Sequence, residues 1–110
     1  MAEVPPQDLV MRFLPAFQWA IPRWTFLWWS HPGTALTSWW RSPERNTAVG
    51  GAPQSQHLYG LAVDAVPRDF DAFMADARRI GLYAVDEGNH VHLQIFPSGY
   101  LASQIGRAHV

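Results

Sequence analysis

The sequence contains no cysteine among its 110 residues. This absence excludes disulfide-stapled folds, zinc sites with thiolate ligands and catalytic cysteines. It leaves the compartment open, because a chain without cysteine tolerates reducing and oxidising surroundings equally well. Charged residues are also scarce at 15%, and the formal net charge is −1. Since there is no basic patch and no run of like charge, we expect neither nucleic-acid binding nor electrostatic attachment to a membrane.

Long apolar runs are missing as well. A transmembrane helix requires about 18 or more consecutive apolar residues, and the richest segment, 13–29, is interrupted by Pro15, Gln18, Pro22 and Arg23. Residues 1–8 carry two acidic residues and two prolines where a secretory signal peptide has basic residues. We therefore expect no stable membrane insertion and no signal peptide. We interpret residues 1–8 as a flexible N-terminal arm before a single domain at 9–110.

Hydrophobic residues make up 48% of the chain, which is enough for one small core. Apolar spacing predicts helices at 9–20, where Pro15 ends or kinks the helix, at 42–49 after the capping residue Ser42, and at 67–81. Strands are predicted at 35–40 and 58–66, followed by a hairpin at 82–96. The expected fold is α+β: a small antiparallel sheet with helices on one face and a cleft on the other.

The hairpin carries an H-x-H pair. Because side chains alternate along a strand, His90, His92 and Gln94 share one side, and the apolar residues between them face the core. Taken alone, the two histidines are explained by a solvated strand face, and the same holds for His57 and Asp64. Taken together, two histidines and a carboxylate match the three protein ligands of a catalytic zinc site, whose fourth position holds water. The remaining histidine would lie beside that water.

The segment SQHLYGLAVD at 55–64 resembles the S-x-H-x-x-G-x-A-x-D motif of M15-type zinc peptidases, which include D-alanyl-D-alanine carboxypeptidases and phage endolysins. The downstream H-x-H is similar to that of the murein endopeptidases and the hedgehog amino-terminal domain. The segment SWWRSPERNTAVGGAP resembles the family's S-G-Y-R-S-P-x-x-N stretch. The resemblance spans about residues 36–96, and it implies a hedgehog/DD-peptidase-like fold and a Zn²⁺ cofactor.

The resemblance also implies roles for individual residues. The metal ligands would be His57, Asp64 and His92, and His90 would be the auxiliary active-site histidine. Arg41 would hold the substrate's terminal carboxylate, a task that suits a guanidinium. The further substrate contacts we expect are Ser55 and Trp40. The other interpretation of Arg41 is a surface ion pair with Glu44 or another nearby acid.

The sequence departs from the family pattern at the catalytic carboxylate. Many members have an acid three residues before the third zinc ligand, and here that position is Asn89, which cannot act as a base. Asp86, six residues before His92, matches the acid of the hedgehog-like variant. Glu87 stands three residues before His90, so a register with His90 as the ligand restores the common pattern. We favour His92 with Asp86.

The six tryptophans have three interpretations: core packing, a wall that stacks on substrate, or a docking patch. His31 and His109 belong to no pattern, and we expect both to be solvent-exposed.

Together these features predict a zinc metallopeptidase that cleaves peptidoglycan stem peptides, as a carboxypeptidase or an endopeptidase. It would be phage-encoded, either a lysis enzyme or a virion component with tail partners. The predicted location is the cytoplasm until release, or the virion, with action on the cell wall. The alternatives are a non-catalytic binding or virion structural module that retains the fold, and a zinc peptidase for other substrates.

Overall fold

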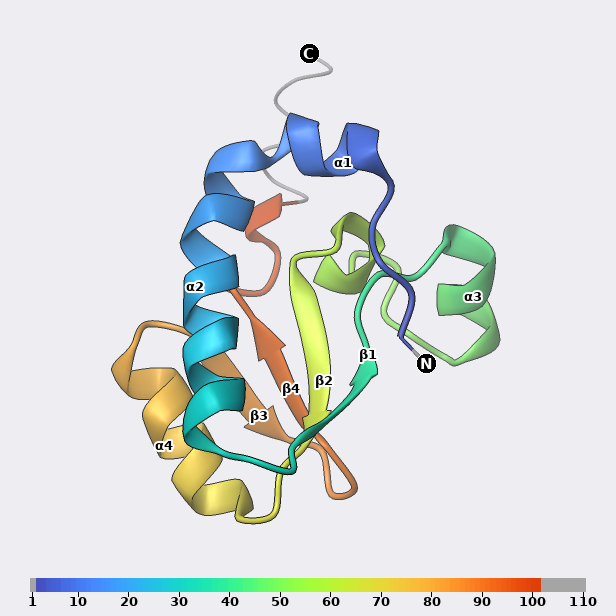
Figure 1. Cartoon of the computed structure of the whole chain (residues 1–110). Helices are drawn as coiled ribbons and strands as arrows, with labels where there is room; N and C mark the ends of the chain where they lie inside the picture. The colour runs from blue at the N-terminus through green and yellow to red at the C-terminus, as the bar shows by residue number, and fades with distance from the viewer. Residues whose placement is uncertain (1, 102–110) are drawn as a thin grey trace.

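The computed structural model describes residues 2–101 of the chain, and Figure 1 shows the arrangement of its helices and strands. In chain order the elements are α1 (Gln7–Arg12), α2 (Leu14–Ser30), β1 (Ala35–Ser38), α3 (Pro43–Ala48), the 3₁₀ helix η1 (Gln56–Tyr59), β2 (Ala62–Val66), α4 (Phe70–Arg79), β3 (Tyr83–Asp86) and β4 (Val91–Gln94). None of these helices is long and apolar enough to cross a membrane.

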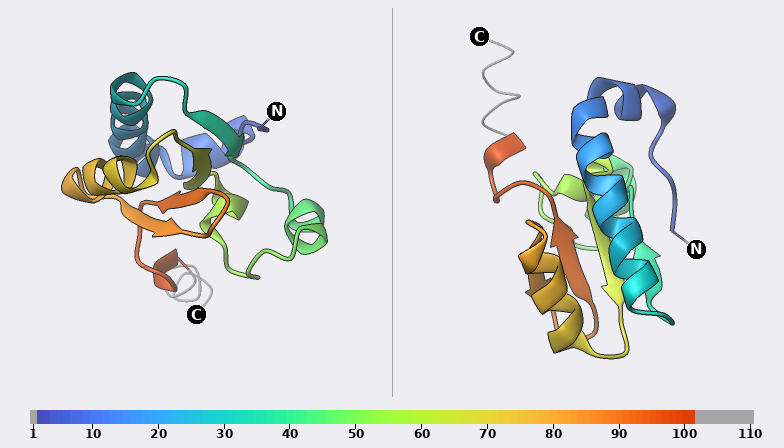
Figure 2. Two further views of the ribbon diagram at one scale, coloured as in Figure 1. Left: turned by 90° about the horizontal axis from the view of Figure 1, so that it is seen from below. Right: turned by 60° about the vertical axis from the view of Figure 1, so that its left-hand side comes forward.

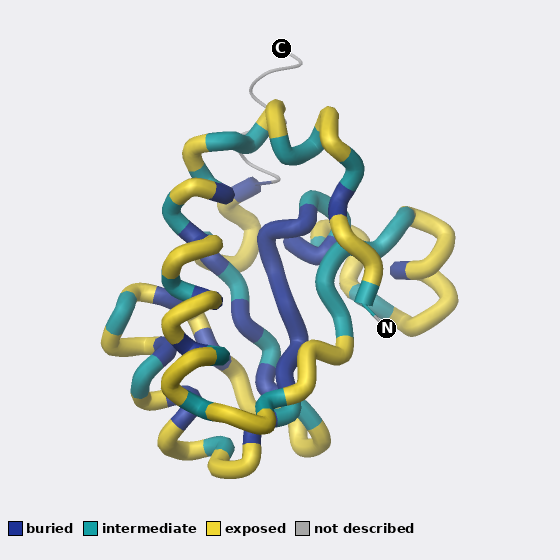
Figure 3. The backbone as a smooth tube through the Cα atoms, in the orientation of Figure 1, coloured by how far each residue is buried: buried dark blue, intermediate teal, exposed yellow. Residues whose placement is uncertain are grey.

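The strands form one antiparallel sheet in the order β1-β2-β4-β3. Helices α2 and α4 lie side by side against one face of this sheet, while α3 and η1 lie away from them (Figure 2). The predicted α+β class is therefore confirmed. Strand β2 lies in the middle of the fold and is buried along almost its whole length (Figure 3).

The hydrophobic core lies between the helices and the sheet. From the sheet it takes Val63 and Ala65 of β2 and Val91 and Leu93 of β4. The helices contribute Phe17, Ala20, Trp24 and Leu27 of α2, and Phe73, Met74 and Ala77 of α4. Because side chains alternate along a strand, the residues between these apolar ones, including Asp64 and His92, point to the opposite face.

Helix α2 is longer than the sequence predicts. The chain breaks its helix at Phe13, Pro15 falls in the first turn of α2, and the helix then continues through Pro22 to Ser30. A proline inside a helix costs about 3 kcal/mol. Burial of Phe17, Trp24 and Leu27 offsets this cost, because each large apolar side chain contributes about 1.5–3 kcal/mol when removed from water. The predicted end near residue 20 is wrong because packing outweighs the lost hydrogen bond.

The other predicted elements are confirmed with shifted ends. The hydroxyl of Ser42 accepts a hydrogen bond from the Arg45 amide and caps α3, and the carboxylate of Asp69 caps α4. The strand predicted at 58–66 begins only at Ala62. Before it, η1 ends at Gly60, whose positive φ of 73° suits glycine, and a β-carbon there would lie 2.8 Å from Pro5.

Residues 2–6, part of the predicted arm, contact the body of the domain. The carbonyl of Glu3 accepts a hydrogen bond from the Trp40 amide at 3.1 Å, and Pro5 is buried. The division into an arm and a domain stays a prediction.

The prediction that His31 is solvent-exposed is wrong. Its side chain is 16% exposed, because its Nε2 lies 2.7 Å from Oδ2 of Asp76 on α4 and its ring packs edge-on against Phe73. His109 lies outside the described residues. Among the tryptophans, Trp24 is buried, whereas Trp29 is 85% exposed. Three others pack against the core while partly exposed: Trp19, Trp28 and Trp39.

Candidate metal centre

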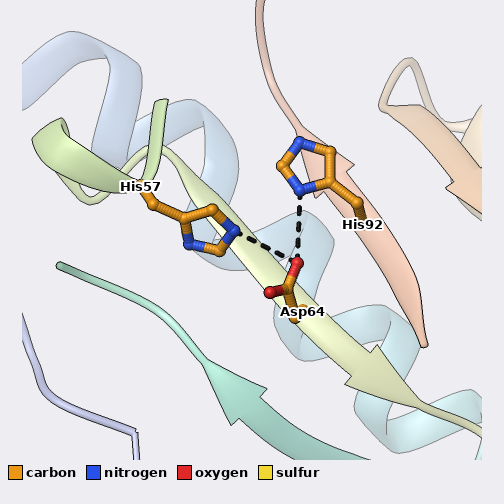
Figure 4. Close-up of side chains that lie close together, drawn as sticks. All are labelled: His57, Asp64 and His92. Atoms are coloured by element: carbon orange, nitrogen blue, oxygen red, sulfur yellow. Dashed lines mark hydrogen bonds and ion pairs between the residues drawn. The ribbon is translucent and has the colours of Figure 1, made fainter. Parts of the chain in front are cut away.

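Three side chains from separate elements converge on the face of the sheet opposite α2 and α4. Asp64 on β2 lies directly opposite His92 on β4 in the strand register, which places their side chains next to each other. His57 reaches the same point from η1, because the turn at Gly60 folds η1 back over the start of β2. Figure 4 shows the two imidazole rings approaching the Asp64 carboxylate from different sides.

The spacing of the donor atoms fits a metal ion. Nε2 of His57 lies 3.1 Å from Oδ1 of Asp64, and Nδ1 of His92 lies 3.2 Å from the same oxygen. All three donor atoms lie within 4.8 Å of one another. Nitrogen and oxygen ligands of tetrahedral zinc lie about 2.0–2.2 Å from the ion, and therefore about 3.4 Å from one another. Small movements of the side chains would bring this set to the geometry of zinc.

The hydrogen bonding of His57 directs a lone pair into this cluster. Its Nδ1 lies 2.6 Å from the backbone carbonyl of Trp39, and the ring is only 1% exposed. A carbonyl oxygen only accepts, so Nδ1 carries the proton and Nε2 of the neutral ring presents its lone pair to Asp64. A lone pair facing a carboxylate is repulsive unless a proton or a cation lies between them. The donor set of His57 and Asp64 is thus suited to a cation.

Arg41 holds the other oxygen of the same carboxylate. Its guanidinium donates to Oδ2 of Asp64 at 2.9 Å, and its Nε donates to Oγ of Ser38 at 3.2 Å. The side chain is 17% exposed. The ion pair considered for Arg41 therefore exists, but its partner is Asp64 and not Glu44. This pairing leaves Oδ1 of Asp64 for the histidines.

The two ionisable groups that face each other across β2 and β4 have shifted pKa values. Burial alone would raise the pKa of Asp64, but the hydrogen bonds and positive charges that His57 and His92 offer in their protonated forms outweigh it and lower the pKa far below its usual range. Burial alone would lower the pKa of His92. Hydrogen bonds to Asp64 and Gln94, together with the negative charges of Asp64 and Glu87, raise it instead. The carboxylate is therefore ionised at neutral pH.

The cluster lies in a cleft with a volume of about 750 Å³. Glu87 and His90 line this cleft, and Oε2 of Glu87 lies 3.5 Å from Nε2 of His90. Nε2 of His90 also lies 3.8 Å from Oδ1 of Asp64. By contrast, Asp86 is exposed, does not line the cleft, and uses its carboxylate to accept a hydrogen bond from the Gly88 amide in the hairpin turn. The structure places Glu87, and not Asp86, in the cleft that holds His57, Asp64 and His92.

Of the two other residues expected to contact substrate, Ser55 lines the cleft and Trp40 does not. Ser55 lines the cleft, and its hydroxyl caps η1 by accepting a hydrogen bond from the His57 amide at 3.2 Å. Trp40 is not among the residues that line the cleft, because its indole N–H donates to the Leu58 carbonyl at 3.0 Å.

Sequence reasoning missed three polar residues around the cluster. Asn46 is buried and accepts a weak hydrogen bond of 3.4 Å from Arg41. It occupies the asparagine position of the S-P-x-x-N stretch, and this match could have predicted that Asn46 belongs to the site. Gln56 is buried beside His57, and Gln94 lies 2.8 Å from Nε2 of His92. Only the shared strand face pointed to Gln94, and no signal pointed to Gln56.

Residues 25–94 match the sequence profile of the family described as Peptidase M15, which covers more than half of the chain. The chain belongs to the peptidase M15 family. The matched range contains every residue of the candidate site. Comparison with curated proteins and with solved structures finds no significant match. M15 peptidases are typically zinc-dependent metallopeptidases, and His57, Asp64 and His92 are the group within residues 2–101 that can hold such an ion.

Proposed function

We propose that this protein is a zinc-dependent peptidase that hydrolyses peptide bonds in peptidoglycan stem peptides. The observation that carries the proposal is the convergence of His57, Asp64 and His92 in a cleft, within the segment that matches the M15 family. Two imidazoles and one carboxylate leave the fourth position of a tetrahedral ion open, which is the arrangement of catalytic zinc sites. When bound there, Zn²⁺ lowers the pKa of water and polarises a carbonyl group.

We assign Glu87 as the general base. Its carboxylate lines the cleft and is partly exposed, so it can accept a proton from the attacking water and deliver it to the leaving amine. This assignment combines the ligand His92 with the acid Glu87, a pairing that the spacing of the sequence did not favour. Asp86, which the sequence favoured, is committed to the hairpin turn.

His90 and Arg41 support the reaction from two sides of the cluster. Nδ1 of His90 lies 2.6 Å from Oδ1 of Asn89, and its Nε2 lies near both Glu87 and Asp64. In the protonated form of the ring, the Nε2–H can stabilise the oxyanion that forms on the substrate carbonyl. Arg41 donates to Asp64, Ser38 and, weakly, Asn46, and the second N–H of each terminal nitrogen is left for a substrate carboxylate. These positions are compatible with carboxypeptidase and with endopeptidase action.

The substrate class is supported by the motif at residues 55–64, which resembles that of peptidoglycan carboxypeptidases and phage endolysins. The cleft walls suit an extended peptide, because small residues line them and leave room for a backbone: Gly50, Gly51, Ala52, Ser98 and Gly99. The proposal includes a phage origin, action on the cell wall and delivery by lysis or by a virion, and the resemblance to phage endolysins supports it.

The test combines metal content with digestion of purified sacculi. The wild type should bind one zinc ion per chain and release cleaved stem peptides that mass spectrometry identifies. His57→Ala and His92→Ala should lose both properties. The matched control is His31→Ala, which removes a histidine outside the cleft and should keep both. A wild type that binds no stoichiometric zinc contradicts the proposal, as does cleavage that persists in both site variants. Cleavage of other peptides but not of sacculi would contradict the substrate assignment alone.

A second candidate function is a non-catalytic module that keeps the metal. The observation in its favour is Asn89, which stands where many family members have the catalytic acid. This function predicts zinc binding and association with sacculi without release of any peptide.

A further inference from the structure

The side-chain amide of Gln94 lies between His92 and a backbone carbonyl. Its Oε1 lies 2.8 Å from Nε2 of His92, and its Nε2 donates to the carbonyl of Phe96 at 2.8 Å. Gln94 follows His92 by two residues on β4, so both side chains stand on the cleft face. The ring of His92 is thus held between Gln94 on one side and Asp64 on the other.

The orientation of this amide is determined by its second partner. A carbonyl oxygen cannot donate, so the NH₂ group of Gln94 must face Phe96 and its oxygen must face His92. The buried side chain of Gln56 holds the same carbonyl. It donates to the Phe96 oxygen at 2.7 Å and accepts hydrogen bonds from the Ile95 and Phe96 amides. The carbonyl that orients Gln94 is therefore itself fixed from the side of η1.

The consequence falls on His92. Because Oε1 of Gln94 accepts, Nε2 of His92 must carry the proton, and the lone pair of the neutral ring lies on Nδ1. That atom points toward Oδ1 of Asp64 at 3.2 Å, as the dashed line in Figure 4 shows. We propose that Gln94 is a positioning residue that selects the tautomer of His92 able to bind the metal, so that His92 binds through Nδ1 and His57 through Nε2. This inference rests on the metal site of the proposed function.

The two histidines differ in how their tautomers are selected. His57 is oriented by the backbone carbonyl of Trp39, which no substitution removes, whereas His92 depends on a side chain. Only the second can be tested by mutagenesis. Groups that orient metal-binding histidines typically contribute about 10–100-fold in metal affinity.

The experiment compares Gln94→Met with the wild type. Methionine has nearly the same length but no strong acceptor, so zinc affinity measured by competition with a chelator should fall by about 10–100-fold. Gln94→Glu keeps an acceptor for His92 but loses the donor to the Phe96 carbonyl, and Ser98, 3.5 Å from the Gln94 amide, offers a hydroxyl to the new carboxylate. This variant should lose less affinity than Gln94→Met. The matched control is Gln54→Met, which alters another glutamine of the cleft wall and should bind zinc like the wild type.

A spectroscopic readout tests the tautomer directly. Long-range ¹H–¹⁵N correlation spectra distinguish the two ring nitrogens. The metal-free wild type, in buffer alkaline enough to keep histidines neutral, should show the proton of His92 on Nε2 and that of His57 on Nδ1. The zinc-loaded protein should show the same protonation, and Gln94→Met should lose this preference at His92 only.

The outcomes separate this inference from the proposed function. If the wild type binds zinc and cleaves sacculi while Gln94→Met binds zinc equally well, the role of Gln94 is wrong and the proposed function stands. A proton on Nδ1 of His92 in the wild type also overturns the inference, whether or not the variant folds. A wild type that binds no zinc overturns both.

Discussion

The side chains of β2 and β4 divide between two faces of the sheet. Val63, Ala65, Val91 and Leu93 point toward α2 and α4 and are buried among apolar groups. Asp64, His92 and Gln94 point toward the cleft, and each is held by specific hydrogen bonds. The helix-covered face is stabilised by removal of apolar area from water, which is non-directional. The cleft face depends on individual partners, because a buried polar group that loses one is left unsatisfied.

This difference predicts that substitutions on the helix-covered face affect the whole fold, while those on the cleft face affect one chemical function each.

Phe73→Ala should lower the free energy of unfolding by about 3–5 kcal/mol, because it removes a fully buried ring and leaves a cavity. Denaturant unfolding of the metal-free protein measures this change. The matched control is Phe26→Ala on α2, where the ring is 41% exposed and the expected change is within about 0.5 kcal/mol. Equal losses in the two variants would show that the helix-covered face does not hold the core.

Glu87→Gln should reduce the rate of peptide cleavage by about 10²–10⁴-fold, the usual contribution of a general base. Zinc content and stability should stay unchanged, because Glu87 is not among the three clustered ligands. Asp86→Asn is the matched control, and it should retain the rate because its carboxylate lies outside the cleft. Loss of cleavage in Asp86→Asn with full activity in Glu87→Gln would return the base to Asp86.

Zinc affinity should fall as the pH decreases through the raised pKa of His92, with the decline beginning above the ordinary value of 6.5. The protonated imidazole has no lone pair for the metal, so protons and zinc compete. Chelator competition across neutral and mildly acidic pH measures the effect. An affinity that stays flat until the pH is well below 6.5 would contradict a ligand role for His92.

The stability of the metal-free protein should change with pH in the opposite direction: the contribution of His92 decreases as the pH rises. A folded-state pKa above the unfolded value means that the contribution of His92 to stability is complete below the unfolded pKa and is lost as the pH rises through the folded one. Thermal unfolding with and without zinc at the same pH values separates the two trends. Parallel curves would contradict this coupling.

The smallest effect concerns the polar pair of His31 and Asp76 on the helix-covered side. A hydrogen bond with Arg79 and one with His31 lower the pKa of the Asp76 carboxyl. The ionised carboxylate therefore stabilises the fold above its ordinary pKa of 3.8, and this contribution is lost as the pH falls through the lower folded value. Asp76→Asn should lower the melting temperature slightly at neutral pH, with the difference from the wild type vanishing in acid. A difference that persists in strong acid would indicate a packing effect instead.

The sequence pattern correctly predicted the elements that are stabilised by residues close together in the chain. Helix α4 has a capping aspartate, an apolar stripe and a glycine directly after its last residues, and the hairpin has a turn-prone quartet between two β-rich runs. The part of α2 beyond residue 20 was not predicted, because a proline such as Pro22 normally ends a helix. Only the burial of Trp24 and Leu27 in the core compensates for the cost of this proline. The ion pair between Arg41 and Asp64 was not predicted either, because the two residues lie 23 positions apart along the chain.

The sequence by itself determined the chemical groups and their local faces: the spacing of His57 and Asp64, and the placement of His90, His92 and Gln94 on one side of a strand. Alternation along a strand gives both histidines the same face, so it cannot decide which one lies beside Asp64. That choice belongs to the pairing of β2 with β4, which sets Asp64 opposite His92. The hairpin turn likewise directs Asp86 to its own backbone and Glu87 to the cleft. The β2–β4 register arises from a contact between distant segments, and the cleft that Glu87 faces is built from several such segments, so only the tertiary structure could decide these two features.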